Sequence, residues 1–414
     1  MLHILIQCIN YPPEIVGGGK YTGEMVEWLA ARGHKISVIT APPFYPQWKI
    51  GEGYSGLAYR QEKHHGVEVI RCPLWVPSKP SSLKRVLVWL SFVIPAAPIV
   101  FWKIIREQPD VVFVIYPYLF AAPWVRLVSL LSKSKTWLHI QDYETDAAFE
   151  LGFFKLKFVR WFATLFENGL LRSFNRVSTI SRRMLERLKL KGVLPEKSVF
   201  FPNWVDTQMI FPTTNSEAFR AQFDLSTKNF VALYSGNMGV KQGLEILIEA
   251  AKKLQNKPNI MFILCGDGAI REQLVQQAQN LNNVKFIPLQ PYEKLNQLLN
   301  MADVHLLPQR ADAADLVMPS KLSGMLASGR PILATANPST QVADTVKNAG
   351  LVVPPGDVGA FVEALLFMES NQEQCQEWGK RAREIAIREW DKEQILLKFE
   401  QELIITTRIA YNKG

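Results

Sequence analysis

The amino-acid sequence predicts an α/β protein made of two doubly wound domains of parallel strands and helices, with a cleft between them. Short, almost uninterrupted apolar segments alternate with longer segments of helical periodicity along most of the chain. This alternation is typical of parallel sheets covered by helices on both faces. It starts again after residue 200, and a length of 414 residues suits two or three domains. We therefore expect a first domain at residues 1–200 and a second one from residue 201.

The first domain is predicted to begin with a strand at residues 2–7, a loop of three glycines and a helix that ends at Gly33. The apolar face of this helix, with a spacing of i, i+4, i+7 and i+8, consists of Tyr21, Met25, Trp28 and Leu29. Further strands are expected at residues 35–40, 67–70, 111–115, 136–140 and 176–180.

The second domain repeats this order after a linker at residues 201–212. Its first strand is expected at residues 230–235, and the helix that follows has an apolar face of Leu244, Leu247, Ile248 and Ala251. Further strands are expected at residues 260–265, 284–288, 304–307, 331–335 and 351–353.

Composition excludes a disordered protein, a collagen-like repeat and a small disulfide scaffold, because 48% of the residues are hydrophobic and 21% are charged. The four cysteines are far apart and form no CxxC pair, so neither a disulfide framework nor a zinc site is indicated. The first ten residues have no basic region and no cleavage site, and they are interpreted as a buried strand instead of a signal peptide. These features fit a reducing, cytoplasmic location.

The net charge of +9 is unevenly distributed: residues 1–200 carry +11 and residues 201–414 carry −2. This asymmetry indicates an anionic partner for the first half, either a membrane face, a phosphorylated acceptor or nucleic acid, unless it is only a solvated basic face. Nucleic acid is the least favoured of these, because no RNP, helix-turn-helix or zinc-finger pattern accompanies the charge.

A run of 17 uncharged residues, 86–102, is at the lower length limit of a membrane-spanning helix. It contains Pro95 and Pro98, and a strand of the predicted sheet follows it directly. A span would separate strands of one sheet across the bilayer. We therefore expect a buried or membrane-dipping helix here.

In open α/β sheets ligands bind at the carboxyl ends of the strands, and several loops of the second domain are expected there. Glycines in the loop after the first strand of this domain permit close approach of main-chain N–H groups to an anion. A helix start with Pro at its first position combines free N–H groups, a positive dipole end and the ammonium of Lys321, and this combination suits a diphosphate. The alternative is a capped helix with a solvated lysine. The residues of these loops are Gly236, Asn237, Met238, Gly239, Gly266, Gln290, Pro319, Ser320, Lys321 and Leu322.

In the first domain, Gly17, Gly18, Gly19 and Lys20 precede a helix and can accept phosphate groups or form a flexible turn. Asp142 follows a strand and can steady a hydroxyl group or a developing cation. No Asp-x-Asp and no His-Glu-x-x-His motif occurs, so we expect no metal site.

Taken together, these loops resemble the glycosyltransferases of the GT-B type in family 4, a family of retaining enzymes. The matching segments are residues 17–20, 32–34, 108–113, 202–207, 235–239, 264–268, 302–308, 319–322, 327–332 and 353–357. The most similar subgroup is that of colanic-acid and O-antigen fucosyl- or N-acetylfucosaminyltransferases.

The resemblance implies two Rossmann-like domains with separate tasks. Residues 201–386 would bind the nucleotide sugar through the loops named above and Lys241, and residues 1–200 would bind the acceptor through Gly17–Lys20 and Asp142. A final helix at about 387–414 would pack back on the first domain. Lys321 and Asp142 are the candidate catalytic residues.

Two positions depart from the family pattern. Asn237 replaces an arginine that many members have after the first glycine, and Gly324 replaces the glutamate that usually holds the donor ribose. Gln141 stands near the place of the family's cleft histidine, and Asp142 is therefore the best polar candidate there.

The expected activity is metal-independent, retaining transfer of a sugar, such as fucose or another 6-deoxyhexose, and no cofactor is expected. The donor would be a GDP- or UDP-linked sugar and the acceptor a polyprenyl-diphosphate-linked saccharide of exopolysaccharide or lipopolysaccharide synthesis. The protein would be peripheral at the inner face of the plasma membrane. The alternatives are a non-catalytic binding protein for a sugar nucleotide or glycolipid, and a sugar-nucleotide epimerase.

Overall fold

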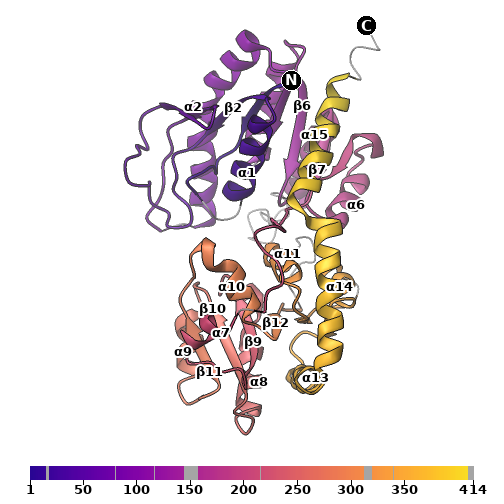
Figure 1. The fold of residues 1–414 in the computed structure, drawn as a ribbon. Coiled ribbons are helices and arrows are strands. Elements are labelled where there is room, and N and C mark those ends of the chain that lie inside the picture. Colours follow the sequence, from indigo (N-terminus) through magenta and orange to yellow (C-terminus); the bar gives the residue numbers. More distant parts are fainter. Residues whose placement is uncertain are drawn as a thin grey trace. The chain divides into compact units, whose positions relative to one another are not determined.

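The computed structural model describes residues 1–414 except 15–17, 80, 116, 144–156, 215, 312–318, 339 and 409–414, and it omits the side chains of residues 82, 118, 157 and 241. The described chain forms two compact units, each around one sheet (Figure 1). Unit 1 comprises Met1–Pro202 and Leu396–Gly414, and unit 2 comprises Asn203–Ile395. The predicted fold class is confirmed.

The sheet of unit 1 has the strand order β3-β4-β2-β1-β5-β6-β7-β8, and all neighbouring pairs are parallel except β3 and β4. Its strands are β1 (His3–Gln7), β2 (Lys35–Thr40), β3 (Arg60–His64), β4 (Val67–Arg71), β5 (Val111–Val114), β6 (Lys135–Ile140), β7 (Arg176–Thr179) and β8 (Ser198–Phe200). We did not predict β3, because it is almost entirely polar and half to fully exposed at the edge of the sheet.

Helices cover both faces of this sheet. They are α1 (Gly18–Ala31), α2 (Ser82–Glu107), α3 (Tyr118–Ser129), α5 (Lys157–Ser173), α6 (Arg182–Leu190) and α15 (Lys392–Arg408). Val112 and Val114 of β5 belong to the core that α2, α3, α5 and α6 complete. Phe113 points to the other face, because side chains alternate along a strand, and there it meets Phe399 of α15.

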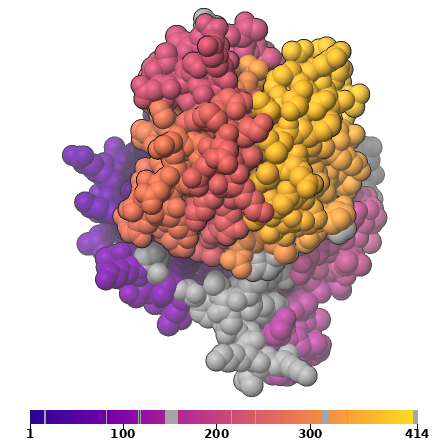
Figure 2. All heavy atoms as spheres, turned by 90° about the horizontal axis from the view of Figure 1, so that it is seen from below, coloured from indigo at the N-terminus to yellow at the C-terminus, as the bar shows by residue number. Residues whose placement is uncertain are grey.

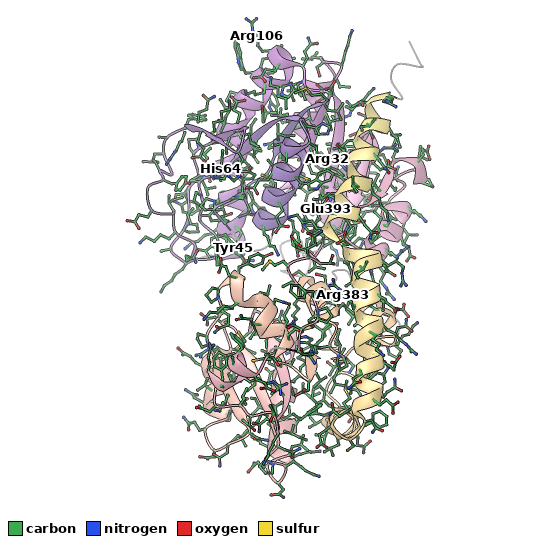
Figure 3. All side chains as sticks on the ribbon, viewed as in Figure 1. Arg32, Tyr45, His64, Arg106, Arg383 and Glu393 are labelled. Carbon is green, nitrogen blue, oxygen red and sulfur yellow. The ribbon has the colours of Figure 1, made fainter. Side chains whose placement is uncertain are left out.

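The C-terminal segment is tied to unit 1 by an ion pair and by aromatic stacking. Glu400 of α15 accepts hydrogen bonds from Arg32 at 2.9 Å and pairs with His34 at 2.9 Å, and Figure 3 shows Arg32 beside this helix. These bonds lower the pKa of Glu400, with the Arg32 bond as the largest cause. Phe399 stacks on Phe201 with ring centroids 4.2 Å apart.

The sheet of unit 2 is entirely parallel, with the order β11-β10-β9-β12-β13-β14. Its strands are β9 (Phe230–Ser235), β10 (Ile260–Cys265), β11 (Val284–Ile287), β12 (Val304–Leu307), β13 (Ile332–Thr335) and β14 (Gly350–Val353). Alternate residues of β9 enter two different cores: Ala232 and Tyr234 one, Val231 and Leu233 the other. The sheet is therefore buried on both faces, which explains its continuously apolar strands.

The helices of unit 2 are α7 (Glu217–Ala221), α8 (Glu245–Lys253), α9 (Arg271–Gln277), α10 (Leu295–Asn300), α11 (Ser320–Ala327), α12 (Gln341–Val346), α13 (Val358–Ser370) and α14 (Gln372–Trp390). Figure 2 shows the unit from below, where the yellow C-terminal helical segment lies along one side. The boundary expected at residue 386 falls inside α14, and unit 2 continues to Ile395. Periodicity did not reveal this, because α14 and α15 are separated only by Asp391.

The helix α11 is held against α14 at two glycines and one arginine. A Cβ on Gly379 would lie 2.2 Å from the carbonyl oxygen of Gly329, so neither main chain could approach this closely around a larger residue. The Arg383 guanidinium, labelled in Figure 3, donates to the carbonyl oxygens of Ala327 at 2.9 Å, Thr207 at 2.8 Å and Ile210 at 2.7 Å. One side chain thus joins α14, the end of α11 and the segment that opens unit 2.

We predict that Arg383→Met lowers the free energy of unfolding by about 3 kcal/mol, because three carbonyl oxygens lose a charged donor. Urea denaturation measures the change. The control is Arg388→Met on the same helix, whose exposed guanidinium pairs with the neighbouring Glu389, and it should change stability by less than about 0.5 kcal/mol. Equal effects of the two variants would contradict this role of Arg383.

Candidate functional site

The carboxyl edge of the unit 2 sheet contains a point where the strand order reverses. From β9 the chain moves outward to β10 and β11, and it then returns to β12 on the other side of β9 before β13 and β14. The loops after β9 and β12 therefore diverge to opposite faces of the sheet. Such a switch point is the usual ligand site of an open parallel sheet.

The loops after β9 and β10 pack main chain against main chain. A Cβ on Gly266 would lie 1.9 Å from the carbonyl oxygen of Gly236, and both glycines have a positive φ, +152° and +144°. The Gly236 N–H donates to the Cys265 carbonyl at 3.0 Å. These glycines are required by backbone contact and conformation, and the contact fixes the Gly236 loop at the switch point.

Met238 and Asn237 of the β9 loop have different roles. The Met238 side chain is fully buried, its N–H donates to Asp267 at 2.7 Å and its carbonyl accepts from Ile270 at 3.1 Å. It therefore anchors the loop and has no main-chain group left for a ligand. Asn237 is exposed, and its carbonyl accepts the Tyr234 hydroxyl at 2.5 Å. Gly239 is half-buried at the end of this loop.

Lys321, in the first turn of α11, lies over the same loop. Its Nζ is 4.1 Å from the centre of the Tyr234 ring, and its Cδ lies 3.4 Å from where a Cβ on Gly236 would be. No carboxylate of the described residues forms an ion pair with it. Burial lowers the pKa of Lys321 to about 7. An ammonium that lies over a ring and pairs with no carboxylate of the described residues suits a bound anion.

The start of α11 adds main-chain donors beside this ammonium. Pro319 is the N-cap, so the N–H groups of Ser320 and Lys321 come first in the helix, where no intrahelical acceptor is available. Ser320 is exposed. Leu322 differs from the expectation: its side chain is fully buried and its N–H donates to Pro319 at 2.9 Å, so it supports the helix start from below.

Two further residues, Gln290 and Lys241, were expected in this group. Gln290 is half-buried after β11, and its side-chain amide donates to the Pro288 carbonyl at 2.9 Å. The same carbonyl accepts the Cys265 thiol at 3.3 Å. The side chain of Lys241 lies outside the described part of the structure. Gly324 is half-buried, and a Cβ there would touch only Leu299, at 3.5 Å.

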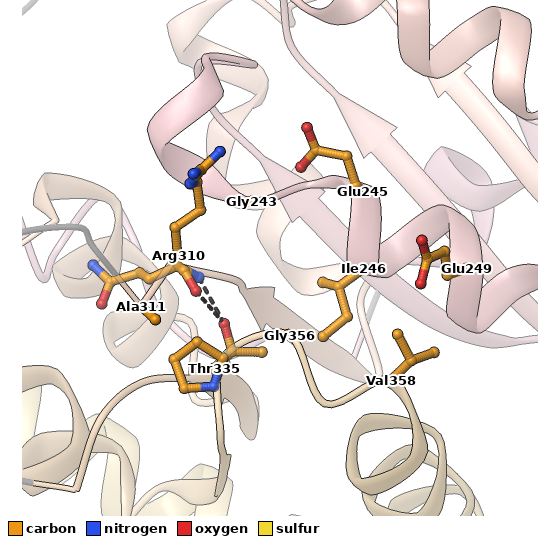
Figure 4. Close-up of a pocket in the computed structure, with 11 residues that line it drawn as sticks. Gly243, Glu245, Ile246, Glu249, Arg310, Ala311, Thr335, Gly356 and Val358 are labelled. Carbon is orange, nitrogen blue, oxygen red and sulfur yellow. Dashed lines mark hydrogen bonds between the residues drawn. The ribbon is translucent and has the colours of Figure 1, made fainter.

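A pocket of about 370 Å³ opens at the ends of β12 and β13, beside the start of α8 (Figure 4). Gln309 and Thr335 form its floor, where the Gln309 N–H donates to Thr335 Oγ1 at 2.8 Å and this hydroxyl donates to the Gln309 carbonyl at 2.8 Å. Its polar wall consists of Glu245, Glu249 and Arg310. We did not predict these three residues, because isolated charged residues in loops and helix starts carry no sequence signal. They can hydrogen-bond hydroxyl groups.

The residues expected to bind a second substrate lie in unit 1. Gly17 is outside the described residues, Gly18 begins α1, and Gly19 is buried against Glu14. Lys20 is half-buried, 3.9 Å from Glu24. Asp142 is exposed, two residues after β6.

Glu14 is a buried carboxylate that the sequence analysis overlooked. It accepts the N–H groups of Phe44 at 2.6 Å and Tyr45 at 2.7 Å and the Asn10 amide at 2.8 Å. Burial raises the pKa of Glu14, against the effect of these bonds. Its sequence context could have revealed it: an acidic residue, shortly after a strand, that follows two prolines and precedes two apolar residues. It orders the loops after β1 and β2 next to Gly19.

One group of possible metal ligands occurs among the described residues, Glu27 with His64 and His65. The two histidines are exposed at the hairpin of β3 and β4, and Glu27 lies on α1. None of them belongs to the loops considered above.

Comparison with known proteins identifies the family. Residues 16–204 match the model of the glycosyl transferase 4-like domain, and residues 215–385 match that of the glycosyl transferases group 1. The chain is 43% identical over 417 residues to the colanic acid biosynthesis glycosyl transferase WcaI of Escherichia coli (strain K12), covering 97% of this chain and all of that one.

Two solved structures are similar in fold. Sucrose-phosphate synthase from Thermosynechococcus elongatus matches with a TM-score of 0.75 and 18% identity over the full length of both chains. HepE from Anabaena, in complex with UDP-glucose, matches with a TM-score of 0.68 and 16% identity over 97% of this chain and 99% of that chain.

These matches span both units, and the similar structures share the GT-B arrangement of two Rossmann-like sheets. The expectations of an enzyme and of this fold are confirmed. The chain is a GT-B glycosyltransferase, and it belongs to the group 1 glycosyl transferases of the GT4 kind.

Proposed function

We propose that this glycosyltransferase acts in exopolysaccharide synthesis of the colanic-acid type, where it transfers a hexose from a nucleoside-diphosphate sugar to a lipid-linked saccharide. The observation that carries the proposal is the 43% identity to WcaI along nearly the whole chain. A similar fold in HepE has been solved with UDP-glucose, which supports a nucleotide sugar as donor. We further propose a GDP- or UDP-linked 6-deoxyhexose such as fucose, and a polyprenyl diphosphate as the lipid.

The donor diphosphate is proposed to bind at the start of α11. There the Lys321 side chain lies over the Gly236 loop, and the N–H groups of Ser320 and Lys321 come first in the helix. When the bond to the sugar breaks, negative charge grows on the leaving diphosphate, and preorganised donors stabilise it in the transition state. These groups supply the positive charge that a divalent metal supplies elsewhere, and we therefore propose a metal-independent reaction.

The stereochemical course is proposed to be retaining, with attack from the side of the leaving group. The family resemblance is its basis. The pocket lined by Glu245, Glu249 and Arg310 has the hydroxyl-binding groups that a hexose requires, and it lies at the same edge of the sheet as Lys321.

The acceptor is proposed to bind to unit 1, through Gly18, Gly19 and Lys20 for its phosphate groups and Asp142 for a hydroxyl group. The excess of basic residues in this half supports an anionic acceptor at an anionic surface. We propose a peripheral location at the inner face of the plasma membrane.

Replacing Lys321 by Ala should lower the turnover number by about tenfold or more, because one charge-stabilising donor is lost in the transition state. Turnover with saturating donor measures it. Lys347→Ala is the matched control, since that exposed lysine is paired only with Asp344 on α12, and its turnover should equal that of the parent protein. Unchanged turnover in the Lys321 variant would remove this lysine from the reaction.

Donor binding should weaken as the pH rises above about 7, because Lys321 loses its proton there in the free protein and the diphosphate needs the ammonium. The loss approaches about tenfold for each pH unit while the bound lysine remains protonated. Calorimetric titration with a nucleotide sugar measures it, since its diphosphate diester does not titrate in this range. Lys321→Met should bind weakly with no such slope; a slope of the same size in this variant would assign the titration to another group.

One nucleoside diphosphate among GDP, UDP, ADP and dTDP should raise the melting temperature more than the others. At about 100 times its dissociation constant a ligand stabilises the native state by roughly 2.7 kcal/mol, which a thermal-shift measurement detects. The responding nucleotide identifies the base of the donor. No response to any of them would contradict a preformed donor site in unit 2.

A further inference from the structure

Three neighbouring helices of unit 1 form one layer on its sheet. The helix α2 packs against α3, and α3 packs against α5. Their inward side chains share the core with β5 and β6, and they include Phe92 and Val100 of α2, Val125 of α3 and Leu171 of α5. We call the opposite side of these helices the outer face of the α2–α3–α5 layer.

The helix α5 has its polarity reversed relative to an ordinary surface helix. Its exposed side chains are mainly large and apolar, 48–71% exposed, and they consist of Phe158, Trp161, Phe162, Leu165 and Phe166. Their spacing of i, i+3, i+4, i+7 and i+8 makes one continuous stripe. The charged Glu167 is instead completely buried, where it pairs with Lys191. This helix therefore presents its apolar stripe to the surroundings and keeps its acid inside.

The other two helices extend the apolar surface. Their outer side chains at least 41% exposed are Leu83, Leu87, Ile94, Phe101 and Trp102 of α2, and Leu127 of α3 with Leu130 and Leu131 just after it. Monomeric proteins rarely leave so many neighbouring large apolar groups in water. Exposed apolar surface of this kind marks an interaction site, so we expect a partner to cover it.

The charged side chains beside this apolar surface indicate the kind of partner that covers it. The exposed charged side chains described on these three helices are all basic: Lys84, Arg85, Arg106, Arg160 and Arg172. Both acids of the layer are paired with lysines: the partly exposed Glu107 with Lys103 at 2.5 Å and Lys35 at 3.1 Å, and the buried Glu167 with Lys191. Arg106 extends outward from the end of α2 (Figure 3), and its guanidinium lies over the Trp102 ring at 5.8 Å.

We propose that the outer face of the α2–α3–α5 layer docks on an anionic lipid bilayer, with its apolar side chains in the interface and its basic side chains at the lipid head groups. Apolar area combined with basic residues is what holds a peripheral protein to anionic lipid. The biological purpose of this docking rests on the proposed function, in which the acceptor is linked to a lipid. The docking surface itself is inferred only from the exposure and charge of its side chains.

The full-length protein should float with vesicles that contain phosphatidylglycerol, and weakly or not at all with pure phosphatidylcholine. The variant Trp161→Ser/Phe162→Ser/Phe166→Ser should lose at least about tenfold in apparent affinity. The matched control, Phe211→Ser/Phe367→Ser/Ile405→Ser, removes three apolar side chains of 45–47% exposure from other elements and should float like the parent. Equal flotation of both variants would overturn the proposal.

A second measurement locates the contact directly. All four native cysteines are buried, so Phe162→Cys can carry a single polarity-sensitive dye, and Ile405→Cys serves as its control. On addition of the anionic vesicles, the dye at residue 162 should shift to the blue and the dye at 405 should not. The same shift at both positions, or at neither, would contradict this docking face.

A second copy of the chain is the competing occupant. Sedimentation of the parent as a dimer, with the α5 variant a monomer and no flotation of either, would replace the bilayer by self-association. These vesicles contain no acceptor, and the nucleotide thermal shift is measured on the same variants. Failure of the docking surface is thereby distinguishable from failure of the proposed transfer reaction, which would abolish product formation but leave flotation intact.

Discussion

The contact between α11 and α14 determines how α11 is placed in unit 2. Because Gly379 and Gly329 allow the two main chains to touch, α11 is held at a fixed depth, and Arg383 fastens its last turn to α14 and to the segment at Thr207 and Ile210. A helix of eight residues has little stability of its own. Its first turn, with Lys321, is therefore placed by tertiary contacts at its far end.

Lys321 is costly for the protein without a ligand. Removing an ammonium from water is unfavourable, and no carboxylate of the described residues compensates for it; the pKa near 7 instead of about 10.4 expresses this cost. The Tyr234 ring offsets a part of it, since an aromatic face attracts a cation by about 0.5–2 kcal/mol. A carboxylate in the same place would stabilise the lysine more, but it would also repel a diphosphate. In the proposed donor site, this arrangement favours binding of a diphosphate over the stability of unit 2.

The sequence predicted the fold class well, because both sheets consist of apolar strands that alternate with helices. Few topologies are compatible with such an order of elements. It failed where the deciding contact is tertiary. The strand β3 has no apolar pattern and exists because it pairs with β4. Met238 lies in the loop after β9 and Leu322 in the first turn of α11, as expected, but the side chains of both are buried. The glycines and Lys321 were proposed because loop geometry and charge have local signatures, and their binding role stays a prediction. Glu14 instead contacts main-chain groups that are distant in sequence, and Arg310 lines a pocket with residues that are distant in sequence.

Periodicity also leaves open which way an apolar stripe faces, and this matters for α2 and α5 of unit 1. Within the described residues α2 alone is long and apolar enough to cross a membrane. Its inner face, however, packs on β1 and β2, and Leu5 and Ile39 of these strands belong to the same core. Withdrawing α2 into a bilayer would expose these two side chains and their apolar neighbours to water at about 1.5–3 kcal/mol each. That cost is comparable to the whole stability of a typical domain, about 5–15 kcal/mol. The helix α2 therefore stays packed on the sheet. Only the apolar side chains on its outer face can contact lipid, together with the apolar stripe of α5.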